Sequence, residues 1–224
     1  MRFALSSINL SRRDATFLIG AGLASGLVAV PLRARAGHST DISGALPALS
    51  FTMTRATDGK EVSATDFRGK VTLLYFGYTF CPDVCPTTLL NLTLVLKKLG
   101  PLADNVRVLF VTVDPNRDTL QTLKQYTSAF APQVVGLRGS ADQLAELAKR
   151  YRVAYSVKPA TKDHSYEVTH SSAVYAFGRD GEVRLLFSGL ATENPDLTGI
   201  ADDLRTLLKQ SSHLSLWRRI LNML

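Results

Sequence analysis

The sequence lacks the features of several common protein classes. It has no internal repeat, no low-complexity tract and no sign of a second domain. No stretch concentrates lysine and arginine with interleaved aromatic residues, which argues against nucleic-acid binding. Cysteine is scarce, with two residues in 224, so any thiol chemistry depends on a single pair. What is present is ordinary for a globular protein with a core, namely 46% hydrophobic and 20% charged residues.

The excess of positive charge lies mainly at the start of the chain. The first 36 residues contain five arginines against one aspartate, so only +3 of the formal net charge of +7 belongs to the rest. Paired arginines at 12–13 precede an apolar run over 15–32 and an A-x-A signal that ends at Ala36. We expect residues 1–36 to be an export signal of the twin-arginine type or, if uncleaved, a membrane anchor. Either way, the folded part would lie in the periplasm or at the outer face of a bacterial inner membrane, which is an oxidising environment.

After a tether at 37–50, the pattern predicts one α/β domain over residues 51–210. A hairpin around the Asp58-Gly59 turn comes first. Continuous apolar runs then predict buried strands, and apolar residues at helical spacing predict the helices between them. In chain order, the further expected elements are strand 70–78, helix 86–99, strand 106–113, helix 118–130, strand 134–139, helix 141–151 with Ser140 as its cap, hairpin 171–189 and helix 196–210. We therefore expect a thioredoxin-like fold, with an N-terminal β-hairpin and a central mixed sheet flanked by helices on both faces.

The final segment, 211–224, has an amphipathic pattern of its own. Its apolar residues at helical spacing are Leu214, Trp217, Ile220, Leu221 and Leu224. Two arginines, at 218–219, lie beside this face. The segment is either a helix that lies on a membrane surface or a terminal helix that packs on the domain.

Both cysteines lie in one short segment, GYTFCPDVCPTT, between a predicted strand and the next helix. Cys81 follows the strand, and Cys85 lies in the first turn of the helix, where free N–H groups stabilise thiolates. Residues four apart at a helix start share a face, so both sulfurs can approach one point. A structural disulfide would close too short a loop to stabilise much. A redox pair is usually C-x-x-C rather than C-x-x-x-C, and two thiolates also suit Cu(I) or zinc.

The residues before the last hairpin bear on the choice between redox and metal chemistry. Thioredoxin-like oxidoreductases have a proline there that faces the cysteines, whereas this chain has Thr169 and His170. We expect the imidazole of His170 to lie opposite the thiolates and to complete a site of two sulfurs and one nitrogen, which suits copper. His164 is the alternative third ligand, and His38 and His213 are expected in the termini.

Three motifs carry a resemblance to a known family. They are VTLLYFGYTFCPDVCPTTL, FVTVDPNRDT and YEVTHSSAVYAF, and they resemble the Sco/SenC family of thioredoxin-like copper-binding proteins over residues 51–209. The resemblance implies an exported or membrane-associated protein that binds one copper ion. It further implies a role in assembling the dinuclear copper site of cytochrome c oxidase subunit II. The copper ligands that it implies are Cys81, Cys85 and His170.

Two positions in these motifs refine the expectation. Asp114, in the second motif, is implied to lie near the site without binding the metal. The family often has aspartate directly before the histidine, and Thr169 stands there in this chain. This removes a carboxylate near the metal, and so either weakens Cu(II) binding or shifts the balance toward Cu(I).

Two mechanisms fit the same residues. A metallochaperone would pass copper to the thiolates of subunit II or another copper-site client, with other copper chaperones as further partners. A thiol-disulfide reductase would instead use Cys81 and Cys85 to reduce the cysteines of that client site. The absent proline and the presence of His170 favour the metallochaperone. A peroxidase is disfavoured, since no P-x-x-x-T/S-x-x-C pattern precedes Cys81.

Overall fold

The computed structural model describes residues 39–162 and 165–221, with side chains described up to residue 210. The predicted export signal, His38 and His164 lie outside these ranges, as do the side chains of His213 and of the predicted C-terminal apolar face. Within the described ranges, no helix is both long enough and apolar enough to cross a membrane.

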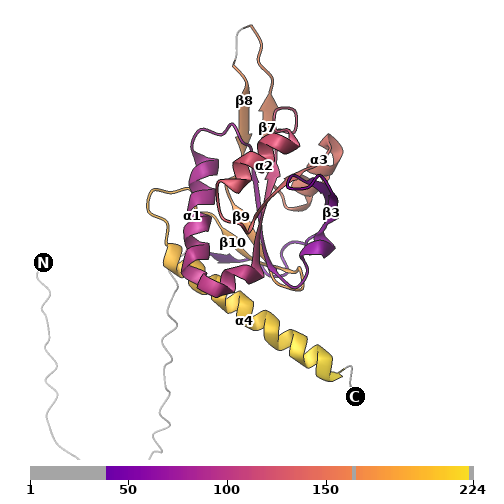
Figure 1. Cartoon of the computed structure of the whole chain (residues 1–224), viewed down its shortest axis with the longest axis vertical. Coiled ribbons are helices and arrows are strands. Elements are labelled where there is room, and N and C mark those ends of the chain that lie inside the picture. Colours follow the sequence, from indigo (N-terminus) through magenta and orange to yellow (C-terminus); the bar gives the residue numbers. More distant parts are fainter. Residues whose placement is uncertain (1–38, 163–164, 222–224) are drawn as a thin grey trace, which may run out of the picture. The chain divides into compact units, whose positions relative to one another are not determined.

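Eight strands form one mixed sheet (Figure 1). Across the sheet, the order is β1 (Thr40–Asp41), β10 (Val183–Phe187), β9 (Val174–Phe177), β4 (Val71–Gly77), β5 (Val106–Thr112), β6 (Val134–Arg138), β2 (Thr52–Arg55) and β3 (Glu61–Ser63). The three central strands β4, β5 and β6 are parallel, and the outer strands pair antiparallel. Every residue of β4 is buried, as the continuous apolar run predicts for a strand that is covered on both faces.

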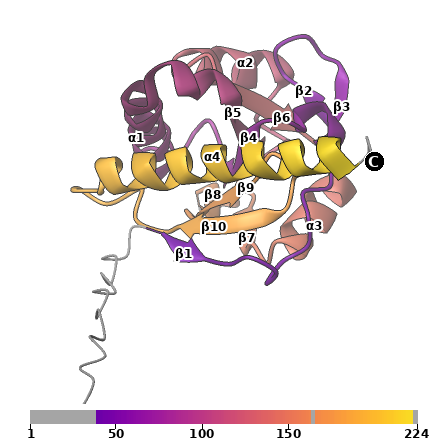
Figure 2. The same ribbon diagram turned by 90° about the horizontal axis from the view of Figure 1, so that it is seen from below.

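Helices cover both faces of this sheet, as predicted (Figure 2). They are α1 (Val84–Leu99), α2 (Leu120–Ser128), α3 (Ala141–Arg150) and α4 (Leu197–Leu221), with 3-10 turns η1 (Ala64–Phe67) and η2 (Gly100–Asn105). On one face, Tyr126 of α2 contacts Phe110 of β5, with ring centroids 5.4 Å apart. On the other face, Tyr151 at the end of α3 contacts Phe177 of β9 at 5.3 Å. The predicted cap of α3 is confirmed, because Ser140 forms a capping box with Gln143. These features confirm the predicted α/β fold class.

Three segments differ from the sequence-based expectation. The described part of the expected tether packs on the domain, because β1 pairs with β10 and Leu49 is buried. Helix α4 runs without a break through residues 211–221, since no proline or glycine follows Gly199 to end it. A further hairpin, β7 (Tyr155–Lys158) with β8 (Glu167–His170), forms a separate two-stranded sheet that projects from the domain in Figure 1.

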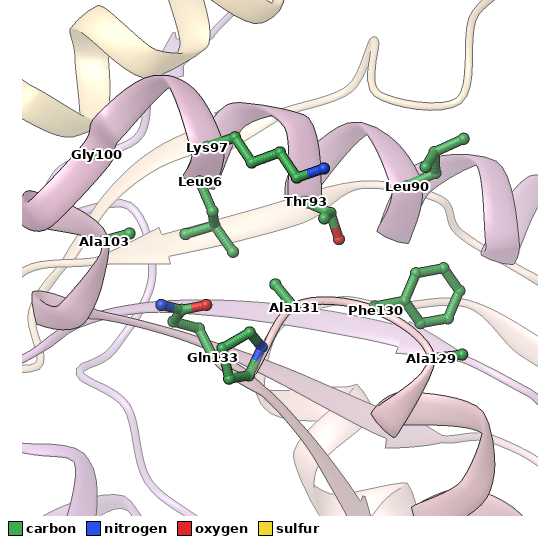
Figure 3. A pocket seen from close by; sticks show the side chains of 11 residues that line it. Leu90, Thr93, Leu96, Lys97, Gly100, Ala103, Ala129, Phe130, Ala131 and Gln133 are labelled. Carbon is green, nitrogen blue, oxygen red and sulfur yellow. The ribbon is translucent and has the colours of Figure 1, made fainter.

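A hollow of about 520 Å³ lies between α1, η2 and the loop before β6 (Figure 3). Leu90, Leu96 and Phe130 form much of its apolar wall, with Lys97 and Gln133 beside them. None of the predicted site residues lines this hollow. The predicted thiol chemistry therefore lies elsewhere in the described part of the chain.

Candidate metal centre

The two cysteines lie at the carboxyl end of the central strand β4. The strand ends at Gly77, and α1 begins at Val84, so Cys85 is in the first turn of the helix. The backbone N–H of Cys85 points to the sulfur of Cys81 at 3.4 Å. Cys85 is fully buried and Cys81 is partly exposed, and both thiols are free rather than joined in a disulfide. A metal or a client molecule can thus reach Cys81 from the surface.

His170, the last residue of β8, brings an imidazole to the same point. Its Nε2 lies 3.2 Å from the sulfur of Cys85. Its Nδ1 lies 3.0 Å from the carbonyl oxygen of Ser171, which can only accept, so an Nδ1–H donates there and Nε2 is the ring nitrogen that faces the sulfur. The possible ligand atoms of the two cysteines and His170 all lie within 4.8 Å of one another. The structure therefore brings together the three residues that the sequence predicts as ligands.

The two thiols have opposite acid–base properties. The pKa of Cys81 is lowered, chiefly by a hydrogen bond from the Cys85 thiol and further by its interaction with His170. The pKa of Cys85 is raised, because its proton is shared with the Cys81 thiolate and because the group is buried. The metal-free site thus holds one thiolate and one thiol. Binding a metal through both sulfurs must release the proton of Cys85.

We expect alkylation to distinguish the two cysteines. The thiolate is the nucleophile, so the lowered pKa of Cys81 should keep its rate with iodoacetamide nearly constant between about pH 8 and pH 5. An ordinary thiol, with a pKa of about 8.5, slows roughly tenfold per pH unit over this range. Cys85 should stay unmodified in the folded protein, because it is buried and protonated. Peptide mass spectrometry after timed alkylation measures both rates, and a tenfold decrease per pH unit at Cys81 would contradict this assignment.

Two buried hydroxyl groups near Cys85 fit a thiolate ligand. The side chain of Tyr75 interacts electrostatically with Cys85, and Thr88 lies one helical turn after it. Neither hydroxyl has a hydrogen-bond partner of good geometry in the structure. A deprotonated Cys85 would provide a nearby acceptor for such buried donors. Since copper binds cysteine as the thiolate, the donor set and its surroundings fit a copper ion.

Gly77 leaves room for the sulfur of Cys85. A Cβ at this position would lie 2.5 Å from the ring of Phe110 and 3.0 Å from the Cys85 sulfur. We expect Gly77→Ala to displace one or both, to lower the free energy of unfolding by about 1–3 kcal/mol and to weaken copper binding. The matched control is Gly189→Ala, whose Cβ would have no atom within 4 Å. Denaturant unfolding of the metal-free proteins compares the two, and equal stability of Gly77→Ala and the control would contradict this expectation.

The loop after β5 supports both sides of the site through two buried carboxylates. Asp118 accepts hydrogen bonds from the backbone N–H and hydroxyl of Thr79 at 3.0 and 2.6 Å, and from Thr112 at 2.6 Å. It thereby holds the segment before Cys81. Asp114 accepts a hydrogen bond from the hydroxyl of Tyr166 at 2.7 Å. Tyr166 lies four residues before His170, so this bond is on the histidine side of the site.

Asp114 is not a member of the cluster of possible ligand atoms. That it supports the site without binding the metal stays a prediction. Sequence reasoning missed Asp118, Thr79 and Tyr166. The repeated aspartates of the VDPNRDT motif were the available signal for a supporting loop.

The site opens to the surface through a hollow of about 330 Å³. Its lining comprises Tyr78, Cys81, Pro82, Asp83, Val84, Val168, Thr169 and His170. Pro82, Val84 and Val168 are its apolar side chains, and Thr169 lies beside His170. This hollow exposes Cys81 and His170 to an incoming molecule, and Cys85 lies behind them.

Comparison with known proteins agrees with this geometry. The family model described as SCO1/SenC matches residues 43–209. The chain belongs to the SCO1/SenC family. The bovine (Bos taurus) protein SCO2 homolog, mitochondrial, is 35% identical over 213 residues, which cover 92% of this chain and 76% of the relative. The chain spans about half the length of the mouse SCO2 and human SCO1 homologues that it also matches.

Solved structures of Sco proteins share the fold and confirm the thioredoxin-like prediction. Arabidopsis thaliana ScoI with copper bound is 32% identical, with a TM-score of 0.64 over 73% of this chain and 98% of that one. Bradyrhizobium japonicum ScoI with copper bound is 39% identical, with a TM-score of 0.63 over 72% of this chain and 99% of that one. These relatives hold copper, the metal that the cysteine–histidine cluster of this SCO1/SenC protein fits.

Proposed function

We propose that this SCO1/SenC protein is a metallochaperone that delivers copper to the dinuclear copper site of cytochrome c oxidase. Cys81, Cys85 and His170 would hold one copper ion as cargo. The observation that supports this most is the convergence of two sulfurs and Nε2 within 4.8 Å, in a chain similar to copper-bound Sco proteins. The soft thiolates favour Cu(I), and the imidazole allows Cu(II) as well.

The unequal exposure of the ligands suggests an order of release. Cys81 lines the surface hollow, so a thiolate of the client can replace it first. Cys85 is fully buried and would be exchanged later, taking up a proton at its sulfur as the metal leaves. Copper would thereby pass between protein ligands without being released into solution.

The second candidate function is a thiol-disulfide reductase, which the opposite pKa shifts of the two thiols favour. The Cys81 thiolate would attack a client disulfide and release one client thiolate. Cys85, after losing its proton, would then attack the sulfur of Cys81 and release the other. The client disulfide gains two electrons, and Cys81 and Cys85 become a disulfide.

A transfer assay distinguishes the two functions. Copper-loaded protein is mixed with the soluble copper-site domain of subunit II in its reduced, metal-free form, and metal-free reduced protein is mixed with the oxidised domain. Delivery predicts that copper appears in the client in the first mixture and that client thiols change little in the second. The reverse pattern would assign the reductase function.

We further propose that the folded part is exported, by way of the arginine-rich segment 1–36. The paired arginines, the apolar run and the A-x-A signal support this location. Subunit II or a related copper-site protein would be the client, and other copper chaperones the donors. For residues 211–224, packing on the domain is favoured over contact with a membrane surface.

A further inference from the structure

Arg117 lies at the centre of a cluster formed by three separate segments of the chain. Its Nε forms an ion pair with Asp114 at 2.5 Å. Its guanidinium carbon lies 3.7 Å from the ring centroid of Tyr166, 4.9 Å from that of Phe80 and 5.9 Å from that of Tyr78. One cation therefore contacts aromatic rings on both sides of the candidate metal centre.

The segments that meet at Arg117 are those that carry the predicted ligands. Phe80 directly precedes Cys81, and Tyr166 directly precedes strand β8, which ends at His170. Arg117 itself belongs to the loop after β5. The guanidinium thus connects the cysteine side of the site with the histidine side, although it is none of the three possible ligands.

The histidine side needs such support. In the described sheets, β8 pairs only with β7, so no ladder of the central sheet holds His170 in place. The hairpin approaches the cysteine loop through a long hydrogen bond of 3.5 Å from the hydroxyl of Tyr78 to the carbonyl of Val168. At the start of β8, the short contacts are those of Tyr166 with Asp114 and Arg117. At its end, His170 lies 3.2 Å from the sulfur of Cys85 and edge-on to the rings of Tyr75 and Tyr78.

An arginine suits this place for a specific reason. Its planar guanidinium can stack on an aromatic face while the edge of the same group donates to a carboxylate. The side chain of Asp114 is fully buried, and its two oxygens accept from Tyr166 and from Arg117 respectively. Removing the cation would leave the buried carboxylate of Asp114 with only the hydrogen bond from Tyr166. Loss of Arg117 should therefore also disturb the contact between Asp114 and Tyr166.

We propose that Arg117 is a positioning residue that holds Tyr166, and with it His170, against the cysteine loop. The imidazole of His170 is then already in its binding position when copper binds, and it dissociates from the metal slowly. This inference rests on the copper-binding part of the proposed function and is independent of delivery.

The test uses the full chain with Arg117→Ala, Arg117→Lys and Tyr166→Phe. The matched control is Arg55→Ala, because Arg55 also forms an ion pair with an aspartate three positions away in the chain and has the same 31% side-chain exposure. None of the cation–π contacts in the described residues involves Arg55. Lysine retains the charge without the planar stacking, and phenylalanine retains the ring without the hydroxyl that reaches Asp114.

Hydrogen exchange of the metal-free proteins gives the first measurement. Arg117→Ala should raise exchange at residues 166–171 by about tenfold or more and leave the central strands protected, with smaller effects in the two conservative variants. Chelator competition and the Cu(II) charge-transfer spectrum give the second. Copper affinity should decrease by about 10- to 100-fold in Arg117→Ala, and Arg55→Ala should match the native protein in both measurements.

The other outcomes overturn either the positioning role or the proposed function. If hydrogen exchange at residues 166–171 and copper affinity are both unchanged in Arg117→Ala, the positioning role is overturned and the proposed function is not. A rise of exchange throughout the protein would assign Arg117 to general stability and would also overturn that role. If Arg117→Ala does not fold, Arg117→Lys and Tyr166→Phe decide by the same criteria. A native protein without tight copper binding would overturn the proposed function itself, and this inference with it.

Discussion

We expect the replacement of His170 with alanine to lower the affinity for copper by more than about 100-fold. This loss exceeds the usual effect of removing a residue that only supports a ligand. The imidazole supplies the nitrogen that lies 3.2 Å from the Cys85 sulfur, and alanine leaves two sulfurs and no third donor in the cluster. Cu(II) binding should suffer more than Cu(I) binding, since thiolates alone favour Cu(I). Competition with chelators of known affinity, for each oxidation state, measures the loss.

The same variant separates the two candidate functions. Reduction of a disulfide needs only the two sulfurs, so His170→Ala should retain most of any reductase activity while it loses copper. His164→Ala is the matched control, because His164 is the alternative ligand from the sequence, and it should bind copper as the native protein does. Native affinity in His170→Ala, or a large loss in His164→Ala, would contradict the ligand assignment.

Replacing Asp118 with asparagine should have the second large effect. The carboxylate accepts three hydrogen bonds, two from Thr79 and one from Thr112, and the residue is 0% exposed. An amide puts an N–H donor in place of one accepting oxygen. Either the hydroxyl of Thr79 must turn from donor to acceptor, or Thr112 and the backbone N–H of Thr79 lose their acceptor. We expect a decrease of about 2–4 kcal/mol in the free energy of unfolding. Copper affinity should decrease as well, because Thr79 lies two residues before Cys81.

Asp66→Asn is a control of matched chemistry. Asp66 also accepts hydrogen bonds from a backbone N–H and a hydroxyl, both of Ser63, but it lies at an exposed capping box. Its substitution should cost about 1 kcal/mol and leave copper binding unchanged. Urea unfolding of the metal-free proteins, followed by copper competition, compares the two variants. Equal decreases in the free energy of unfolding for both variants would show that the burial of Asp118 does not add to its contribution to stability.

Much of the central fold could be predicted from the sequence because its signals are local. The continuous apolar runs of β4 and β5 predict strands buried on both faces, and a single C-x-x-x-C segment at the end of β4 locates both thiols. His170 could be predicted from its place directly before the final hairpin of the central sheet. In each case, the residue type and its neighbours in the chain contain the information.

The supporting contacts could not be predicted in the same way. The hydrogen bond from Tyr166 to Asp114 joins residues 52 apart, and that from Thr79 to Asp118 joins residues 39 apart, so no sequence spacing marks them. The β7–β8 hairpin has strands of only four residues with partial burial, which gives too weak an alternation to recognise. These contacts depend on tertiary packing, and they are the ones that hold the predicted ligands in position.

X-ray absorption spectroscopy at the copper edge shows whether Cys81, Cys85 and His170 bind copper together. The reduced protein without residues 1–36 is loaded separately with Cu(I) and Cu(II), and metal content is measured on the same samples, beside His170→Ala. We expect one copper per chain with two sulfur neighbours and an imidazole nitrogen, and the loss of that nitrogen in the variant. No tightly bound copper in the native protein, together with a readily reduced Cys81–Cys85 disulfide, would contradict the account and favour the reductase.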